Sequence, residues 1–294
     1  MDNTYFFPLV AALCAFSACK TLSQRVGAGR HVHSATDSIL FISAFFFFTS
    51  FAFLPSFLAN LPAGATVAYA VGGAVLNLGF QVSYTVALTA GPMGLTCLFA
   101  GLSMLIPVLG ASVLLGESFG TFRMIGLALT LIALTLNTDF RRRESGTSRI
   151  WGVATLLTFL FNGFAYFWQK WFAVGPYGSD IAGYNFLSYF LAAILGLLLI
   201  LVLGRRGIKP SARPGRGFFG WAALVGLALG CFQWLFTYSQ RVLEASLLLP
   251  VYNGLATVTM TVLGLLLFRE RLTKRRFLST LIGVAAILLF GITG

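Results

Sequence analysis

Two lysines stand inside apolar stretches of the sequence, where little water is present to solvate a charge. Lys20 and Lys170 each follow an aromatic residue by four positions, and they are 150 positions apart. A charged side chain at the centre of a bilayer costs roughly 2.5–3.5 kcal/mol even on the lenient insertion scale, so it usually has a function. Each ammonium group has two interpretations. It attracts the carboxylate or phosphate of a substrate, or it extends to the membrane interface with its alkyl stem buried.

Amides and aromatic hydroxyls form a second group of candidate residues within the apolar runs. In a bilayer such side chains need partners, so they face neighbouring helices or a water-filled cavity. For any single residue, bonding between helices without a substrate is the alternative. The set as a whole indicates a substrate cavity, which we expect to be lined by Lys20, Asn77, Gln81, Tyr84, Asn162, Tyr166, Lys170, Gln233, Trp234, Tyr238, Tyr252 and Asn253.

The acidic residues do not indicate a catalytic or proton-relay site. None of the eight stands in the middle of an apolar run. Glu117 and Glu270 occupy corresponding corners, each just before the last apolar run of its half. Because the dipole at the N-terminus of a helix favours an acid, we expect both to act structurally at the start of the following helix.

No pattern of an enzyme, a metal site or a cofactor site is present. His31 and His33 have no further ligands nearby, and the four cysteines stand singly in apolar runs. Nucleophile elbows, HExxH motifs and phosphate-binding loops are absent. The net charge of +12 does not indicate nucleic acid, because the basic residues lie in a few short loops. We therefore predict no catalytic residues, no metal and no cofactor.

The elements that carry the candidate residues have the length that a membrane requires. The chain is 58% hydrophobic and only 10% charged, whereas soluble proteins carry roughly a quarter of charged residues. A helix needs about 20 apolar residues to cross a bilayer core of roughly 30 Å. We predict ten spans, at residues 5–23, 39–58, 66–88, 93–115, 122–137, 150–172, 180–203, 217–239, 246–268 and 275–292.

The two halves of the chain repeat one pattern. Besides the lysines, Gln81 and Gln233 each follow a phenylalanine and lie 152 positions apart, and the two corner acids lie 153 apart. Five spans per repeat is an odd number, so the repeats enter the membrane from opposite sides. We predict an all-α membrane protein with one membrane domain, in which residues 1–140 and 141–294 are inverted five-helix repeats.

The basic residues predict the orientation. The loops after predicted spans one, five, seven and nine, counted together with the adjoining span ends, hold 17 of the 20 lysines and arginines. All four loops fall on one face, which the positive-inside rule makes cytoplasmic. Both termini are then expected outside the cytoplasm.

Together these features resemble the drug/metabolite transporter superfamily, in its EamA-like branch. The resemblance covers the whole chain and rests on ten spans, the duplication, a lysine closing the first helix of each half, and the acids Glu117 and Glu270 before each last helix. It implies a monomeric carrier in the plasma (inner) membrane, with a cavity lined mainly by helices one to four and six to nine. Familiar bacterial members have both termini in the cytoplasm, so the predicted orientation is opposite to theirs.

The residues and the resemblance predict a secondary-active transporter that works by alternating access. Its expected substrates are small polar or amphipathic metabolites, and the resemblance alone suggests export or exchange of amino acids. A channel-like facilitator is the alternative. The expected partners are the small-molecule substrate and the lipid bilayer.

The orientation leads to the first testable prediction. A reporter that is active only in the cytoplasm should stay silent at the C-terminus, whereas one that is active only outside should give a signal. The opposite result would show that this chain has the orientation of its familiar relatives and that the charge count misleads.

Overall fold

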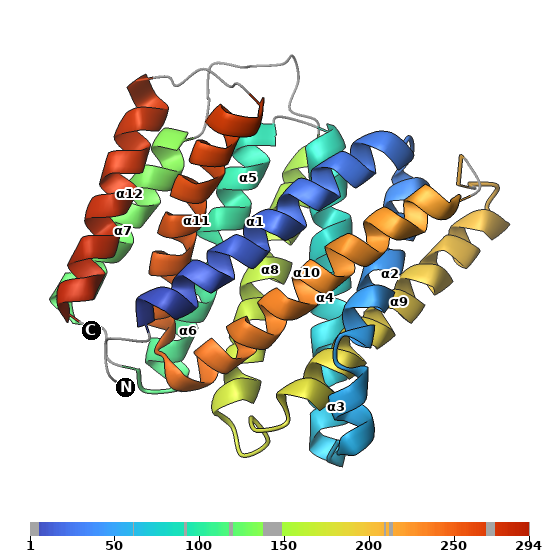
Figure 1. The fold of residues 1–294 in the computed structure, drawn as a ribbon, viewed down its shortest axis with the longest axis horizontal. Helices are drawn as coiled ribbons and strands as arrows, with labels where there is room; N and C mark the ends of the chain where they lie inside the picture. The colour runs from blue at the N-terminus through green and yellow to red at the C-terminus, as the bar shows by residue number, and fades with distance from the viewer. Residues whose placement is uncertain are drawn as a thin grey trace.

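The computed structural model is helical, and it describes residues 6–60, 62–90, 93–117, 120–137, 149–208, 210–211, 214–268 and 274–293. These residues form twelve helices and contain no strand. Both ends of the chain lie at the same face of the bundle (Figure 1). The helices are α1 (Phe6–His31), α2 (Ala35–Phe51), α3 (Leu54–Ala59), α4 (Gly64–Ala90), α5 (Met93–Leu102), α6 (Leu105–Leu114), α7 (Thr121–Asn137), α8 (Arg149–Val174), α9 (Ile181–Arg205), α10 (Arg216–Val242), α11 (Ala245–Phe268) and α12 (Lys274–Thr293).

Every predicted span coincides with a helix or with two consecutive helices. Within the described residues, five segments are long and apolar enough to cross a membrane: Gly64–Ala90, Leu95–Leu114, Arg149–Val174, Ile181–Arg205 and Arg216–Val242. Four further apolar helices are shorter. Helix α1, where the first span is predicted, is not among these segments.

Two predicted spans are interrupted, and a proline accounts for each interruption. Proline has no N–H, and its ring clashes with the carbonyl four residues earlier. For Pro55 that residue is Phe51, where α2 ends, and for Pro107 it is Ser103, which lies between α5 and α6. The two predicted spans, 39–58 and 93–115, therefore each consist of two consecutive helices, although Leu95–Leu114 as a whole is long and apolar enough to cross a membrane.

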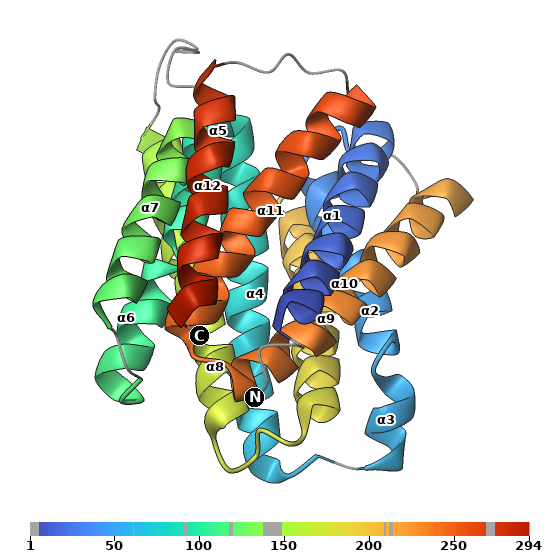
Figure 2. The same cartoon turned by 60° about the vertical axis from the view of Figure 1, so that its left-hand side comes forward.

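Helices from the two halves of the chain pack against each other. Helix α1 lies on α10, α4 lies on α8 and α9, and α2 lies on α9 and α10. Helices α7 and α12 form a separate antiparallel pair at the side of the bundle, next to α11 (Figures 1 and 2). The halves are therefore interleaved rather than being two separate bodies.

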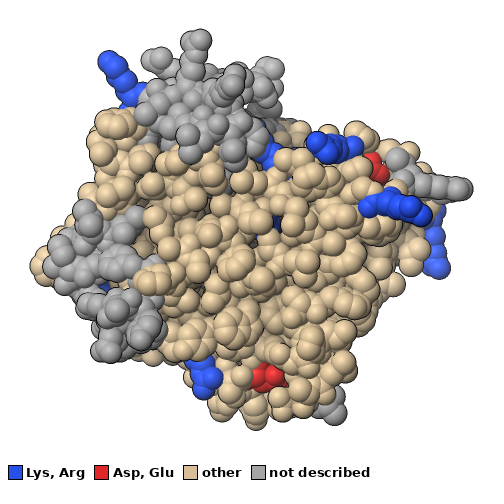
Figure 3. All heavy atoms as spheres, in the orientation of Figure 1, with Lys and Arg blue, Asp and Glu red and all other residues tan. Residues whose placement is uncertain are grey.

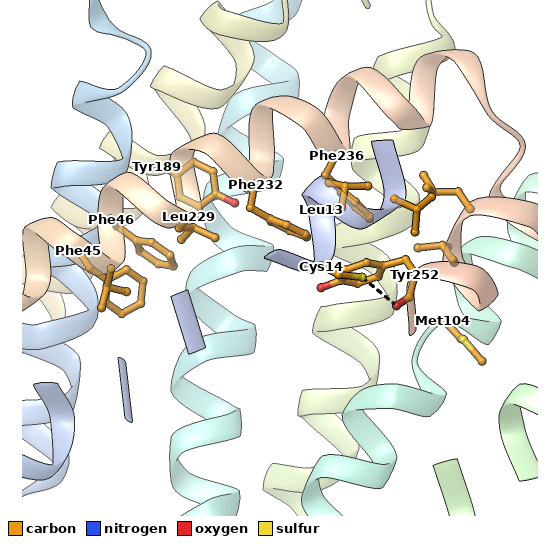
Figure 4. Packing of buried hydrophobic residues seen from close by; sticks show 14 of the residues in the cluster. Leu13, Cys14, Phe45, Phe46, Met104, Tyr189, Leu229, Phe232, Phe236 and Tyr252 are labelled. Atoms are coloured by element: carbon orange, nitrogen blue, oxygen red, sulfur yellow. Dashed lines mark hydrogen bonds between the residues drawn. The ribbon is translucent and has the colours of Figure 1, made fainter. Parts of the chain in front are cut away.

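The core is built from aromatic side chains in the middle of the bundle. Phe232 and Phe236 of α10 stack at 5.2 Å, and both rings pack against Tyr252 of α11 (Figure 4). The Tyr252 carbonyl accepts a hydrogen bond from the Cys14 thiol of α1. On the other side, Phe46 of α2 packs against Tyr189 of α9 at 5.3 Å. These rings hold α1, α2, α9, α10 and α11 around one centre.

Basic residues gather at the face opposite the two termini. Lys and Arg atoms are concentrated along the upper edge of the molecule, where α1, α9 and α12 have charged ends (Figure 3). Among the described residues, Arg30, Arg205 and Lys274 belong to these helix ends, and Arg216 begins α10. We call this side the basic face and the side with the termini the opposite face.

The crossing of α2 over α10 depends on a glycine. A Cβ atom at Gly226 would lie 2.6 Å from the Phe45 carbonyl oxygen and 2.9 Å from the Thr49 nitrogen, so the two backbones would have to separate. We expect Gly226→Ala to lower the free energy of unfolding by about 1–3 kcal/mol. Thermal unfolding of purified protein checks this.

Gly220→Ala is the matched control, since a Cβ at Gly220 on the same helix would meet nothing within 4 Å. Equal melting temperatures for the two variants would contradict the close contact of α2 with α10.

Candidate functional site

A buried ion pair joins the two halves of the chain at the opposite face. The Lys170 Nζ of α8 lies 2.6 Å from a carboxylate oxygen of Glu117, which follows α6. The same ammonium donates to the carbonyl oxygens of Gln240 at 2.8 Å and Leu243 at 2.6 Å. All three donors of the lysine are therefore used. The side chains of Lys170 and Glu117 are only 3% and 10% exposed.

Glu117 has the structural role that was predicted, but at a different helix. Its second carboxylate oxygen accepts a hydrogen bond of 2.6 Å from the Ala245 amide, the first residue of α11. The prediction placed it at the start of the following helix, which is α7. Glu117 meets the start of α11 instead, because α11 packs against both α6 and α7, the helices on either side of Glu117 in the chain. The corresponding acid, Glu270, lies outside the described residues.

A second ion pair lies beside the first. Arg123 near the start of α7 forms an ion pair with Glu244, and its guanidinium also donates to the Ser246 hydroxyl at 3.2 Å. The Arg123 and Glu244 side chains are 16% and 38% exposed, so this pair meets more solvent than the first. The two pairs connect α7, α8 and the corner between α10 and α11.

Next to Lys170, a chain of buried amides and a hydroxyl links three helices. The Gln169 amide of α8 donates to the Gln233 side chain at 3.0 Å and to Thr237 at 2.7 Å, both on α10. Asn185 of α9 also donates to Thr237, at 3.1 Å. Gln240 is one turn further along α10, is 1% exposed, and its side-chain amide has no partner among the described residues. Polar contacts thus join α8, α9 and α10 beside the ion pair at the opposite face.

The residues at the corresponding positions of the first half are not engaged in this way. Lys20 of α1 is half-buried and forms no ion pair or hydrogen bond with any described residue. Gln81 of α4 is 7% exposed, and its side-chain amide likewise has no partner in the described part of the chain. Both lie in the half of their helix that is nearer the basic face.

Three predicted site residues bond to their own or a neighbouring helix. The Asn77 amide donates to the Gly73 carbonyl on α4 at 2.8 Å, and the Tyr84 hydroxyl lies 3.3 Å from the Cys97 sulfur of α5. Asn162 of α8 donates to the Ala100 carbonyl at 3.1 Å and to the Ser103 hydroxyl at 2.7 Å. At the break between α5 and α6 the Ala100 carbonyl thus accepts from the side chains of Asn162 and Ser103 rather than from the Met104 amide, which donates to Gly101.

Tyr166 and Tyr252 lie toward the aromatic core of the bundle. Tyr166 is half-buried and packs on Phe236 at 5.3 Å. The Tyr252 hydroxyl lies 2.9 Å from the Ser17 hydroxyl, three residues before Lys20 on α1. Asn253 donates to the Leu249 carbonyl within α11.

Trp234 and Tyr238 are not brought together with the other candidates. They are 49% and 39% exposed and stack on each other at 6.1 Å. Their neighbours along the same side of α10 are the exposed Leu227 and Val242. This side of the helix is apolar and faces outward, whereas Gln233 faces inward.

The residues that complete the polar network carried only a weak signal in the sequence. Gln169 continues the i, i+4, i+7 pattern of Asn162 and Tyr166, and Thr237 follows Gln233 by four positions. Helical spacing thus places them on the right faces. Their pairing depends on how α8, α9 and α10 meet, which spacing within one helix does not define.

Comparison with known proteins gives the class of this protein. The model of the EamA-like transporter family matches residues 149–292, so the second half of the chain belongs to this family. A solved structure titled "Crystal structure of protein" superposes with a TM-score of 0.77 over 97% of this chain and 96% of the other, at 15% sequence identity. That match shows a shared fold. No curated protein matches the sequence.

Family membership and the long apolar helices identify an integral, multi-pass membrane protein of a transporter family. The polar network is then enclosed by lipid, which makes each unpaired polar group costly.

The buried ion pair generates a stability prediction. Removing one charge leaves the other buried without a partner, so Glu117→Gln or Lys170→Met should each lower stability by about 3–5 kcal/mol. The double variant should regain part of this loss, because no uncompensated charge remains. A double-mutant cycle measured by thermal unfolding of the purified protein tests the coupling.

Glu244→Gln is the control at the same face, and its loss should be smaller, about 1 kcal/mol, because this pair meets more solvent than the first. If the double variant lost as much stability as the two single variants added together, the energetic coupling of Glu117 with Lys170 would be contradicted.

Proposed function

We propose that the protein is a secondary-active carrier of small polar or amphipathic metabolites, such as amino acids, and that it works by alternating access. The observation that carries this proposal is an asymmetry between corresponding residues of the two halves. Lys170 and Gln233 are fully engaged near the opposite face, whereas Lys20 and Gln81 near the basic face have no partners among the described residues. A carrier needs such a difference, because only one side of it is closed at a time.

The proposed architecture has ten spans in two inverted repeats, residues 1–140 and 141–294. Helix packing supports it, because contacts occur in corresponding sets. Helix α1 on α10 corresponds to α8 on α4, and α2 on α10 corresponds to α9 on α4. Helices α2 and α9 are counterparts in the two proposed repeats, as are α7 and α12. Each of these two pairs is in contact, so exchange of the repeats leaves these contacts unchanged. The family model supports it further, since its match covers the second proposed repeat alone.

Exchange of the two repeat conformations would produce the second state of the carrier. In that state the contacts of Lys170 with Glu117, Gln240 and Leu243 break, and the region around Lys20 closes in their place. Inverted repeats support this exchange because either repeat is able to adopt the conformation of the other. The polar contacts at the opposite face would therefore be present in one state of the carrier and broken in the other.

Lys20 is the residue that we assign to the charged group of the substrate. An unpaired ammonium in a membrane interior marks a binding site for an anionic group. Ser17 lies one helical turn before Lys20 on α1, and its hydroxyl is 2.9 Å from the Tyr252 hydroxyl of α11. An ammonium and two hydroxyls suit a small acid with other polar groups, as an amino acid is.

The direction of transport follows from the orientation. If the basic face is cytoplasmic, Lys20 is nearer the cytoplasm and the substrate binds from that side. Export, or exchange against an outer substrate, is the corresponding direction. The carrier would act as a monomer in the plasma membrane.

A channel-like facilitator is the alternative, and counterflow separates the two. Vesicles loaded with unlabelled substrate should accumulate labelled substrate transiently above equilibrium if the protein is a carrier. A channel would only equilibrate the label. The substrate is first identified by thermal-shift screening of small acids and amino acids, because a ligand that binds the folded state raises its apparent stability.

The corresponding glutamines give the mutational prediction. Gln81→Leu should leave stability unchanged and reduce counterflow per folded molecule, because its amide has no other partner in the described structure. Gln233→Leu should in addition lower stability by roughly 0.6–2 kcal/mol, because it loses the bond from Gln169.

Trp234→Leu on the exposed side of α10 is the control and should transport normally. If Gln81→Leu and Gln233→Leu both kept the native turnover number and half-saturation concentration, these two glutamines would not belong to the substrate site.

A further inference from the structure

An open apolar groove lies between α4 and α8, away from the polar network. It encloses about 520 Å³ and is lined by four residues of α4, from Gly79 to Val86, and by six residues of α8, from Arg149 to Phe161. Ile150 and Val153 on its rim are 66% and 59% exposed, so the groove opens on the outer surface of the bundle. It is independent of the substrate site proposed above.

The groove begins at a level where α4 and α8 are in close contact. A Cβ at Gly79 would lie 2.9 Å from the Phe161 ring, so α4 and α8 touch at this level. One turn further, the buried Thr158 hydroxyl donates at 3.3 Å to Ser83, which lines the groove. From there the lining continues along α8 to Arg149, the first residue of that helix.

The length and polarity of the groove suit an acyl chain. From Phe161 to Arg149 an α-helix rises about 18 Å, at 1.5 Å per residue. Half of a bilayer's hydrocarbon core is about 15 Å thick. The groove therefore runs through approximately one leaflet. Lipid must fill it, because an empty apolar groove forgoes the contacts of every atom that lines it.

Among the described residues that line the groove, Arg149 alone is charged, and it stands at the end nearest the basic face (Figure 1). Its exposed guanidinium has no ion pair with a described residue. A guanidinium binds phosphate oxygens through two parallel hydrogen bonds. The cytoplasmic leaflet, which the charge distribution assigns to the basic face, is the one rich in anionic lipids.

We propose that this groove is a binding site for an anionic phospholipid, with one acyl chain between α4 and α8 and the phosphate on Arg149. The lipid would fill the outer surface where the two halves of the chain meet. Its binding would stabilise the contact of α4 with α8 without entering the substrate path.

The test compares lipid retention by native mass spectrometry after exchange of the intact protein into mixed micelles with phosphatidylglycerol or phosphatidylcholine. The native protein should retain phosphatidylglycerol preferentially. Arg149→Ala should lower that preference about fivefold, which corresponds to about 1 kcal/mol per arginine at an anionic surface. Val153→Trp fills the groove from an exposed position, so it should fold normally and lose both lipids.

Arg216→Ala is the matched control, since Arg216 is likewise the exposed first residue of a helix at the basic face but does not line the groove. Equal retention of phosphatidylglycerol by Arg149→Ala and the native protein would overturn the proposal, as would an equal loss in Arg216→Ala. Unchanged lipid binding in Val153→Trp together with lost counterflow would assign the groove to the substrate instead.

Discussion

A charged lysine enclosed in an apolar bundle must be satisfied from within the protein, and the architecture of the opposite face follows from this constraint. Lys170 requires three acceptors, which come from the corner after α6 and from the end of α10. Glu117 in turn accepts from the first amide of α11. One ion pair thereby fixes the relative positions of α6, α8, α10 and α11. Hydrogen bonds from Gln169 of α8 and Asn185 of α9 to the Thr237 hydroxyl connect α9 to the same polar network.

The account of function depends on the difference between this lysine and its counterpart. Lys20 occupies the corresponding position in the first half, yet no described residue supplies it with an acceptor. Two chemically equivalent residues in different environments are what a carrier with two exchanging halves requires. In the proposed carrier, an anionic substrate would compensate the cost of leaving Lys20 unpaired, and this would couple substrate binding to the closing of that side. The Glu117–Lys170 contact would limit how easily the opposite face opens.

Much of the helical pattern could be predicted from the sequence, because apolar length is a local property. Each predicted span lies on one helix or on two consecutive helices, and the inward positions of Gln233 and Asn162 follow from helical spacing. The break at Pro55 was missed, because hydrophobicity continues across it while the backbone helix does not. The partner of Lys170 was also missed. Glu117 is 53 positions away and approaches only when the corner after α6 reaches α8, so contacts between helices were needed to find it.

Solvent access to Gln240 tests the central claim most directly, namely that the Glu117–Lys170 pair keeps the opposite face closed. In a background without the four native cysteines, Gln240→Cys places a thiol at a position that is 1% exposed in this structure. A membrane-impermeant thiol reagent applied to the opposite face should label it slowly. Adding Glu117→Gln should raise the labelling rate at least tenfold, while Glu244→Gln should leave it unchanged. Equal rates with and without the Glu117 charge would show that this ion pair does not hold the face closed.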